Sequence, residues 1–157
     1  MTRRRVLASG LALVVLAAVV VAGVLVVRRL ATSPQERYCA TVVAQRAALS
    51  DRLSAGTPDV LITALPVFED LQDDAPSDIT DEWRQVVDAI RGLRDALDAT
   101  GVDPATYDRT DPPDGVGTAE TQRIDDAAGV LGSQETSAAL ADLDQQARDL
   151  CRTPLTQ

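Results

Sequence analysis

The stretch ITDEWRQVVDAIRGLRDAL, residues 79–97, decides the fold of this chain. Its apolar side chains recur every three or four residues, at Ile79, Trp83, Val86, Val87, Ile90, Leu93 and Leu97. This spacing places them on one face of an α-helix, which other elements then have to cover. We therefore expect a long amphipathic helix that Ser77 or Asp78 caps and Gly101 ends, with Trp83 packed inward beside Val87, Ile90 and Leu97.

Two helices are expected before this stretch. Ser33-Pro34-Gln35-Glu36 is a capping box with proline at the first helical position, and it predicts a helix that ends at Gly56. Thr57-Pro58 predicts the start of a second helix. Because a proline ring clashes with the preceding helical turn, Pro66 predicts a kink or a split within that second helix.

Two shorter helices are expected after it. Thr118 and Ser133 are their predicted starts, Gly132 separates them, and the last one ends before Pro154. No alternating run of β-branched residues follows residue 30. The predicted fold is therefore all-α, a bundle of four to five helices over residues 36–152 followed by a C-terminal tail at 153–157.

A second informative stretch is VLASGLALVVLAAVVVAGVLVV, residues 6–27, which contains no charged residue. Its 22 residues are enough for a helix to cross a hydrocarbon core of about 30 Å. The run is too long for an ordinary signal peptide and lacks a good small-residue cleavage site, so we expect an uncleaved anchor; cleavage is the alternative. Residues 1–5, with three arginines, are expected in the cytoplasm, and residues 28–35 form a juxtamembrane linker.

The charge of the remaining chain excludes some partners. Residues 30–157 hold all 24 acidic residues and 10 of the 15 basic ones, a formal charge of −14. Such a charge repels phosphate backbones and anionic lipid headgroups, so no nucleic-acid partner is expected. The membrane partner is the lipid bilayer, through residues 6–27 alone.

Cys39 and Cys151 are the only cysteines, and they lie near the two ends of the predicted bundle. Outside the cytoplasm, such a pair predicts a disulfide that ties these ends together. Two unrelated buried thiols are the alternative. The expected location is thus the plasma membrane, as a single-pass protein with an extracytoplasmic C-terminal domain.

No catalytic, cofactor-binding or metal-binding residue is predicted. The chain has no histidine, which removes the usual base of a serine or cysteine nucleophile and the usual zinc ligand. Four aspartates lie in the proline- and glycine-rich segment 101–117, namely Asp103, Asp108, Asp111 and Asp114. Their spacing does not match a calcium loop, and we interpret the segment as a solvated surface loop.

Several stretches resemble a group of small actinobacterial envelope proteins of unknown function. These are Glu36-Arg37-Tyr38-Cys39, FEDLQDDAPSDITDEW at 68–83, GVDPATY at 101–107 and QQARDLC ending at Cys151. The resemblance implies an N-terminal signal or anchor and a helical domain that ends in a cysteine, and it implies no activity or cofactor.

The expected function is a non-catalytic binding or structural module of the cell envelope, with an unidentified envelope protein as a possible partner. Two alternatives stay open. One is ligand or Ca²⁺ sensing through the aspartate loop 101–117. The other is a hydrolase that uses paired carboxylates.

Overall fold

The computed structural model describes residues 33–57 and 59–156. Within these residues the chain is helical, with no strand, which confirms the all-α prediction. The helices are α2 (Pro34–Ser54), α3 (Val60–Asp73), α4 (Thr80–Asp98), α5 (Thr118–Leu131) and α6 (Gln134–Cys151). The predicted membrane helix, residues 6–27, lies outside the described residues. No helix in the described part is both long enough and apolar enough to cross a bilayer.

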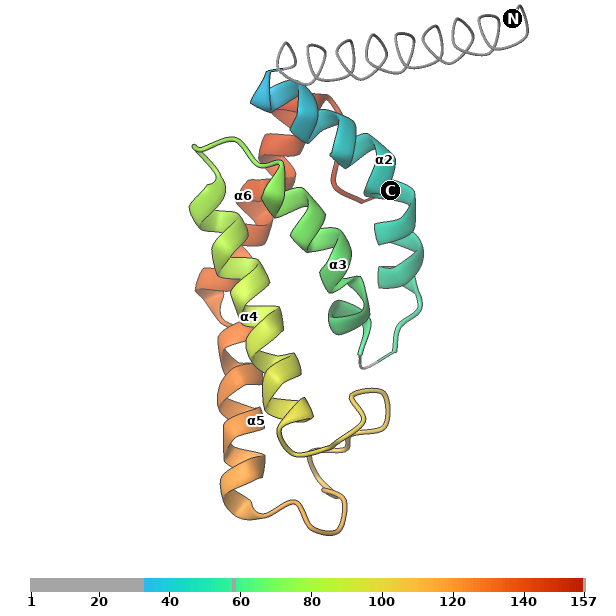
Figure 1. The fold of residues 1–157 in the computed structure, drawn as a ribbon, viewed down its shortest axis with the longest axis vertical. Coiled ribbons are helices and arrows are strands. Elements are labelled where there is room, and N and C mark those ends of the chain that lie inside the picture. Colours follow the sequence, from blue (N-terminus) through green and yellow to red (C-terminus); the bar gives the residue numbers. More distant parts are fainter. Residues whose placement is uncertain (1–32, 58, 157) are drawn as a thin grey trace, which may run out of the picture. The chain divides into compact units, whose positions relative to one another are not determined.

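The helix formed by the sequence stretch quoted above, α4, is the centre of the compact unit Pro34–Gln157. It packs against α3, α5 and α6, while α2 packs against α3 and α6. Figure 1 shows α5 and α6 following one another along α4, with α3 on its other side. The apolar face of α4 is thus covered from several directions, as its sequence pattern requires.

Aromatic side chains form the middle of the main core. Trp83 is 0% exposed, as predicted, and its ring centroid lies 6.4 Å from that of Tyr38 and 6.2 Å from that of Phe68. These rings come from α4, α2 and α3, so one cluster joins the three helices. Val87 and Ile90 belong to the same cluster.

Leu97 does not pack with Trp83, and this part of the prediction was wrong. It belongs to a second, smaller core with Val102 and Ile124. The helical face is continuous in sequence, but α4 spans about 28 Å at 1.5 Å per residue and passes from one set of neighbours to another. The second core fixes the 101–117 segment and α5 against the end of α4.

Helix boundaries follow the sequence signals in most places. Gly56 and Gly101 have positive φ angles of 66° and 65°, and each follows a helix end, as expected for glycine in the left-handed region. The Ser133 side chain accepts a hydrogen bond from the Thr136 N–H and so caps α6 as predicted. The segment 101–117 contains no helix or strand.

Two predicted helix starts differ. Neither Ser77 nor Asp78 caps α4: its N-cap is Ile79, without a side-chain cap, because Asp78 accepts a hydrogen bond from Gln146 of α6 instead. The second helix starts at Val60, after a turn closed by a hydrogen bond from the Val60 N–H to the Thr57 carbonyl.

Pro66 does not split α3, which continues through it as one helix. Pro66 lacks the N–H that would bond the Ile62 carbonyl one turn earlier. Arg52 of α2 donates a hydrogen bond to the carbonyl of the next residue, Thr63, and so links α2 to α3.

Candidate functional site

The structure joins Cys39 and Cys151, as the sequence predicts. Their Cα atoms lie 5.1 Å apart across 112 residues of sequence. This is within the usual range of about 4.4–6.8 Å for bridged cysteines, so the bond needs no backbone movement. It ties the second turn of α2 to the last residue of α6.

The chain turns sharply after the disulfide. Arg152 has a φ of 55°, a left-handed conformation that ends α6. Thr153 and Leu155 are then buried, although both lie in the segment predicted as a C-terminal tail. In the predicted tail 153–157, the described residues 153–156 are therefore packed against the bundle.

The aspartate loop 101–117 uses its carboxylates locally. Asp103 accepts a hydrogen bond from the Ala105 N–H, and Asp108 accepts from the N–H and the hydroxyl of Thr110. These bonds, first the one from the Thr110 side chain, hold the pKa of Asp108 below its usual value. They are typical turn-stabilising contacts of aspartate.

These aspartates do not assemble into a metal site. In residues 33–57 and 59–156, no group of three or more Asp, Glu, Cys or His side chains lies close enough to hold a metal ion. Nearby, Arg109 pairs with Asp125 of α5 at 2.7 Å. The geometric condition for the calcium-sensing alternative, convergence of the four aspartates, is thus not met.

A shallow groove of about 340 Å³ between α4 and α6 does bring carboxylates together. Ala138 and Ala139 form part of its lining, and the carboxylates are those of Asp81, Glu82, Glu135 and Asp142. The Oε2 atom of Glu82 is shielded from solvent and finds no hydrogen-bond partner within the described part of the chain. We call this surface the acidic groove.

A second groove, of about 460 Å³, lies between α2 and α3. Alanines and the polar Thr41 and Gln45 line it on the α2 side, and Asp70, Asp73 and Asp74 line it opposite. The Thr41 hydroxyl donates to Asp74 at 2.6 Å, and the Gln45 amide donates to Asp70 at 2.9 Å. These bonds occupy part of the carboxylate surface and cross-link the two helices.

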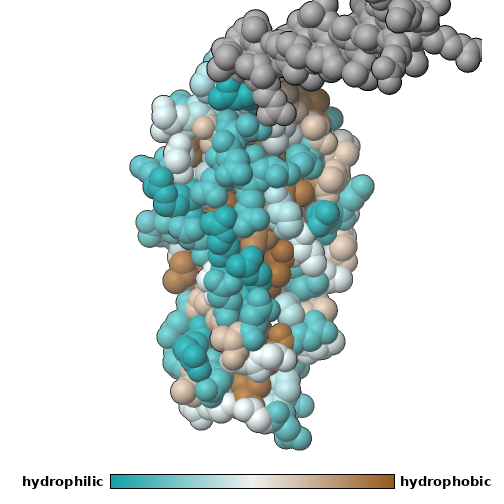
Figure 2. All heavy atoms as spheres, viewed as in Figure 1, coloured by the Kyte–Doolittle hydropathy of each residue, from teal (hydrophilic) through white to brown (hydrophobic). Residues whose placement is uncertain are grey.

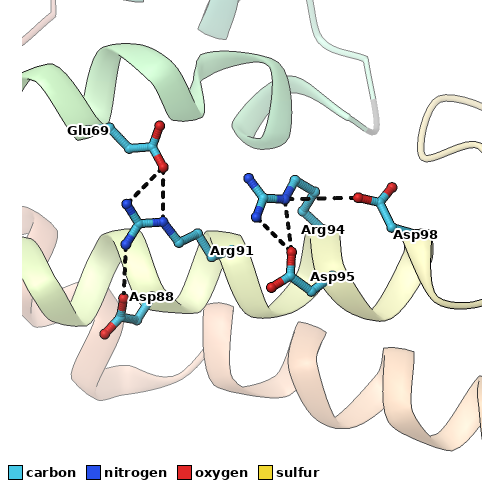
Figure 3. Close-up of polar contacts among 6 residues, drawn as sticks. All are labelled: Glu69, Asp88, Arg91, Arg94, Asp95 and Asp98. Carbon is cyan, nitrogen blue, oxygen red and sulfur yellow. Dashed lines mark hydrogen bonds and ion pairs between the residues drawn. The ribbon is translucent and has the colours of Figure 1, made fainter.

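Two arginines of α4 form ion pairs in Figure 3, one of them with α3. Arg91 bonds Glu69 of α3 at 2.8 Å and Asp88 of its own helix at 3.3 Å. Arg94 bonds Asp95, also in α4, at 2.7 Å, and this carboxylate raises the pKa of the guanidinium above its usual value. Pairs this exposed add little stability. The Arg91–Glu69 pair links α3 to α4, and the Arg94 pair stays within α4.

Polar groups inside the main core are sparse. The Tyr38 hydroxyl and the Trp83 indole N–H are both shielded from solvent, and no well-formed hydrogen bond is present for either in the described residues. Burial raises the pKa of Tyr38 to about 12, opposed by the neighbouring indole N–H of Trp83. Trp83 is therefore a core residue and not a platform on the surface for a ligand.

Hydrophilic residues cover most of the face shown in Figure 2, with apolar residues in separate small areas. The most exposed large apolar side chains among the described residues are Val43 at 63% and Val130 at 52%. Isolated exposed side chains of this kind are normal on a soluble surface.

Comparison of the chain with models of protein families, with curated proteins and with solved structures finds no match in any of the three. The resemblance to actinobacterial envelope proteins therefore stays a prediction from the sequence. Function has to be argued from the disulfide, the grooves and the surface charge.

The sequence identified the disulfide but missed the acidic groove. Asp81 and Glu82 lie 53 or more residues before Glu135 and Asp142, so no local motif links them. The sequence does show that these four residues lie on the polar faces of α4 and α6. Which polar faces meet depends on how the helices pair, and that is a property of the fold.

Proposed function

We propose that this chain is a membrane-anchored, non-catalytic binding or structural module of the cell envelope, with its helical domain outside the cytoplasm. The observation that carries the proposal is the Cys39–Cys151 pair at bonding distance. Disulfides persist in oxidising compartments and are rare in the cytosol. The apolar run at residues 6–27 supplies the expected anchor.

The position of the disulfide suits a small anchored domain. It closes a loop of 112 residues, for which the chain-entropy model gives about 4–5 kcal/mol of stabilisation before strain. Only the linker 28–33 separates the apolar run from α2. The disulfide therefore stabilises the domain at the N-terminal end of α2, where the chain leads to the proposed anchor.

Within the helical domain, loop 101–117 lies far from the disulfide. The bond from Gln146 to Asp78 places the start of α4 beside the end of α6, near the disulfide. Loop 101–117 follows the opposite end of α4. Under this proposal, loop 101–117 and α5 form the surface that an envelope partner binds.

The location is tested by labelling in intact cells. Cysteine is introduced at the exposed position Val130 in one variant and at Thr2 in another, and a membrane-impermeant maleimide is added. We expect labelling of Val130→Cys, and labelling of Thr2→Cys only after lysis. Labelling of Thr2→Cys in intact cells, or of Val130→Cys only after lysis, would reject the proposed orientation.

The binding role is tested by crosslinking in the same cells with a carbodiimide, which couples the carboxylates of this lysine-free chain to amines of a partner. Recovery of a partner with the parent chain, and its loss with both a glycine–serine loop and a scrambled loop of equal length in place of 101–117, supports the role. A scrambled-sequence loop of the same composition is the matched control, because it keeps the charge. A partner captured equally by all three chains would argue against recognition at this surface.

A carboxylate hydrolase is the second candidate, and one observation favours it. The Glu82 Oε2 atom is shielded and unpaired beside Asp81, Glu135 and Asp142. Glycoside cleavage uses two carboxyl groups, one as general acid and the other as nucleophile or base, and the acidic groove places Glu82 beside three further carboxylates. Release of a chromogenic aglycone from a glycoside panel by the parent chain, and not by Glu82→Gln, would establish this function.

A further inference from the structure

The last residues of the chain form a strap across one side of the bundle. We call residues 152–156 the C-terminal strap. It begins at Arg152, whose left-handed backbone turns the chain away from α6. Figure 1 shows this red segment lying beside α2. The strap therefore packs on α2 and does not extend into solvent.

The strap is held by few contacts. Arg46 of α2 donates to the Thr153 hydroxyl at 2.5 Å, and the Leu155 N–H donates to the Asp144 carboxylate at 3.0 Å. The Leu155 side chain is 6% exposed and belongs to the main core cluster. One apolar side chain therefore anchors a segment with no secondary structure of its own.

The free energy gained from these contacts is close to the entropic free-energy cost of ordering the strap. Burying one leucine offsets the lost backbone entropy of only about one or two residues. The strap holds several ordered residues between Arg152 and Leu155. The chain already joins the strap to α6, so whether the strap stays closed depends on a tether that holds its root, the end of α6, beside α2.

The disulfide is that tether. Cys151 directly precedes Arg152, and its bond to Cys39 fixes the root of the strap to α2, seven residues from the Arg46 contact. Both cysteines are only partly buried and pack against the edge of the main core. Without the bond, the last turn of α6 and the strap share no covalent link with α2.

We propose that the Cys39–Cys151 disulfide is a redox latch that keeps the C-terminal strap closed. A dithiol reductant supplies two electrons and two protons: its own thiols become a disulfide, the Cys39–Cys151 bond breaks, and two thiols form. The strap then opens, which exposes Leu155 and the apolar edge of the core that it covers between α2 and α6. The bundle around Trp83 remains folded. This inference does not depend on the location proposed above.

The test is amide hydrogen exchange on the full chain in detergent micelles, with and without dithiothreitol. The strap reporter is the amide of Leu155, whose hydrogen bond to Asp144 requires the strap to fold back along the bundle. The Thr153 N–H, which bonds the Ala147 carbonyl at the end of α6, reports the root of the strap. Val87 and Ile90 in α4 report the core. We expect reduction to speed exchange of the strap amides at least tenfold, while the core amides stay protected because the bundle remains folded.

Two outcomes overturn the proposal. Unchanged strap amides after complete reduction would mean that the strap does not need the bond. Strap and core amides that lose their protection together would mean that reduction unfolds the bundle as a whole.

A variant separates the latch from general destabilisation. Leu155→Asp removes the apolar anchor with the disulfide intact, and Val130→Asp makes the same change at a position that is 52% exposed. We expect Leu155→Asp to accelerate strap exchange in the oxidised protein and to abolish any further effect of the reductant. Val130→Asp should behave like the parent chain. A response of Leu155→Asp to the reductant equal to that of the parent would also reject the latch.

Discussion

Replacement of Trp83 by alanine is the sharpest test of the core. The side chain is 0% exposed and packs against the rings of Tyr38 and Phe68 from two other helices. Removal of a large aromatic side chain from a core costs about 3–5 kcal/mol. Each lost aromatic pair adds about 0.5–1.5 kcal/mol to the burial term. Because two such pairs are lost, we expect the upper part of the range, about 4–5 kcal/mol.

A loss of this size is a large fraction of the 5–15 kcal/mol typical of a domain, so the variant should melt about 10–20 °C lower than the parent. Unfolding of the full chain in detergent is followed by far-ultraviolet circular dichroism, because the variant has lost the only tryptophan. The matched control is Val43→Ala, at a side chain that is 63% exposed. A loss below about 1 kcal/mol for Trp83→Ala, or equal losses for both variants, would refute the packing described here.

Further predictions concern the anchor, the loop and a buried hydroxyl. Mass spectrometry of the membrane fraction should recover a peptide from the extreme N-terminus; only a shortened soluble form would contradict the anchor. Ca²⁺ should shift the melting temperature of neither the parent chain nor the Asp108→Asn/Asp111→Asn double variant; a shift in the parent alone would restore the sensing alternative. Tyr38, with its pKa raised to about 12, contributes stability that is complete below pH 10 and is lost as pH rises through 12. The loss should reach about 2–3 kcal/mol and be absent from Tyr38→Phe, as pH-dependent urea titrations can measure.

Local signals account for most of the secondary structure. The spacing of apolar residues around Trp83, the serine cap at Ser133 and the glycines at helix ends each act within a few residues, so the sequence shows them directly. The disulfide was predictable for a different reason. With two cysteines and an extracytoplasmic assignment, only one intramolecular pairing exists.

Interactions between distant segments explain the differences. Asp78 is a good cap by type, but its carboxylate bonds Gln146, which is 68 residues away in sequence. Leu97 continues the apolar face of α4, yet Ile124 of α5 covers it in a separate core. The four carboxylates of the acidic groove meet only because α4 and α6 pack together. None of these partners is indicated by a local pattern.

Leu155 shows why the C-terminal strap was assigned to a tail. It is one apolar residue between Pro154 and Thr156, with no periodic neighbours to predict burial. Its burial follows from the left-handed turn at Arg152 and from the bond at Cys151, which together direct the chain onto α2. The disulfide therefore does more than connect the ends of the bundle. It extends the core by one side chain that packing alone would hold only weakly, and this part of the core should be the first to respond when the bond is reduced.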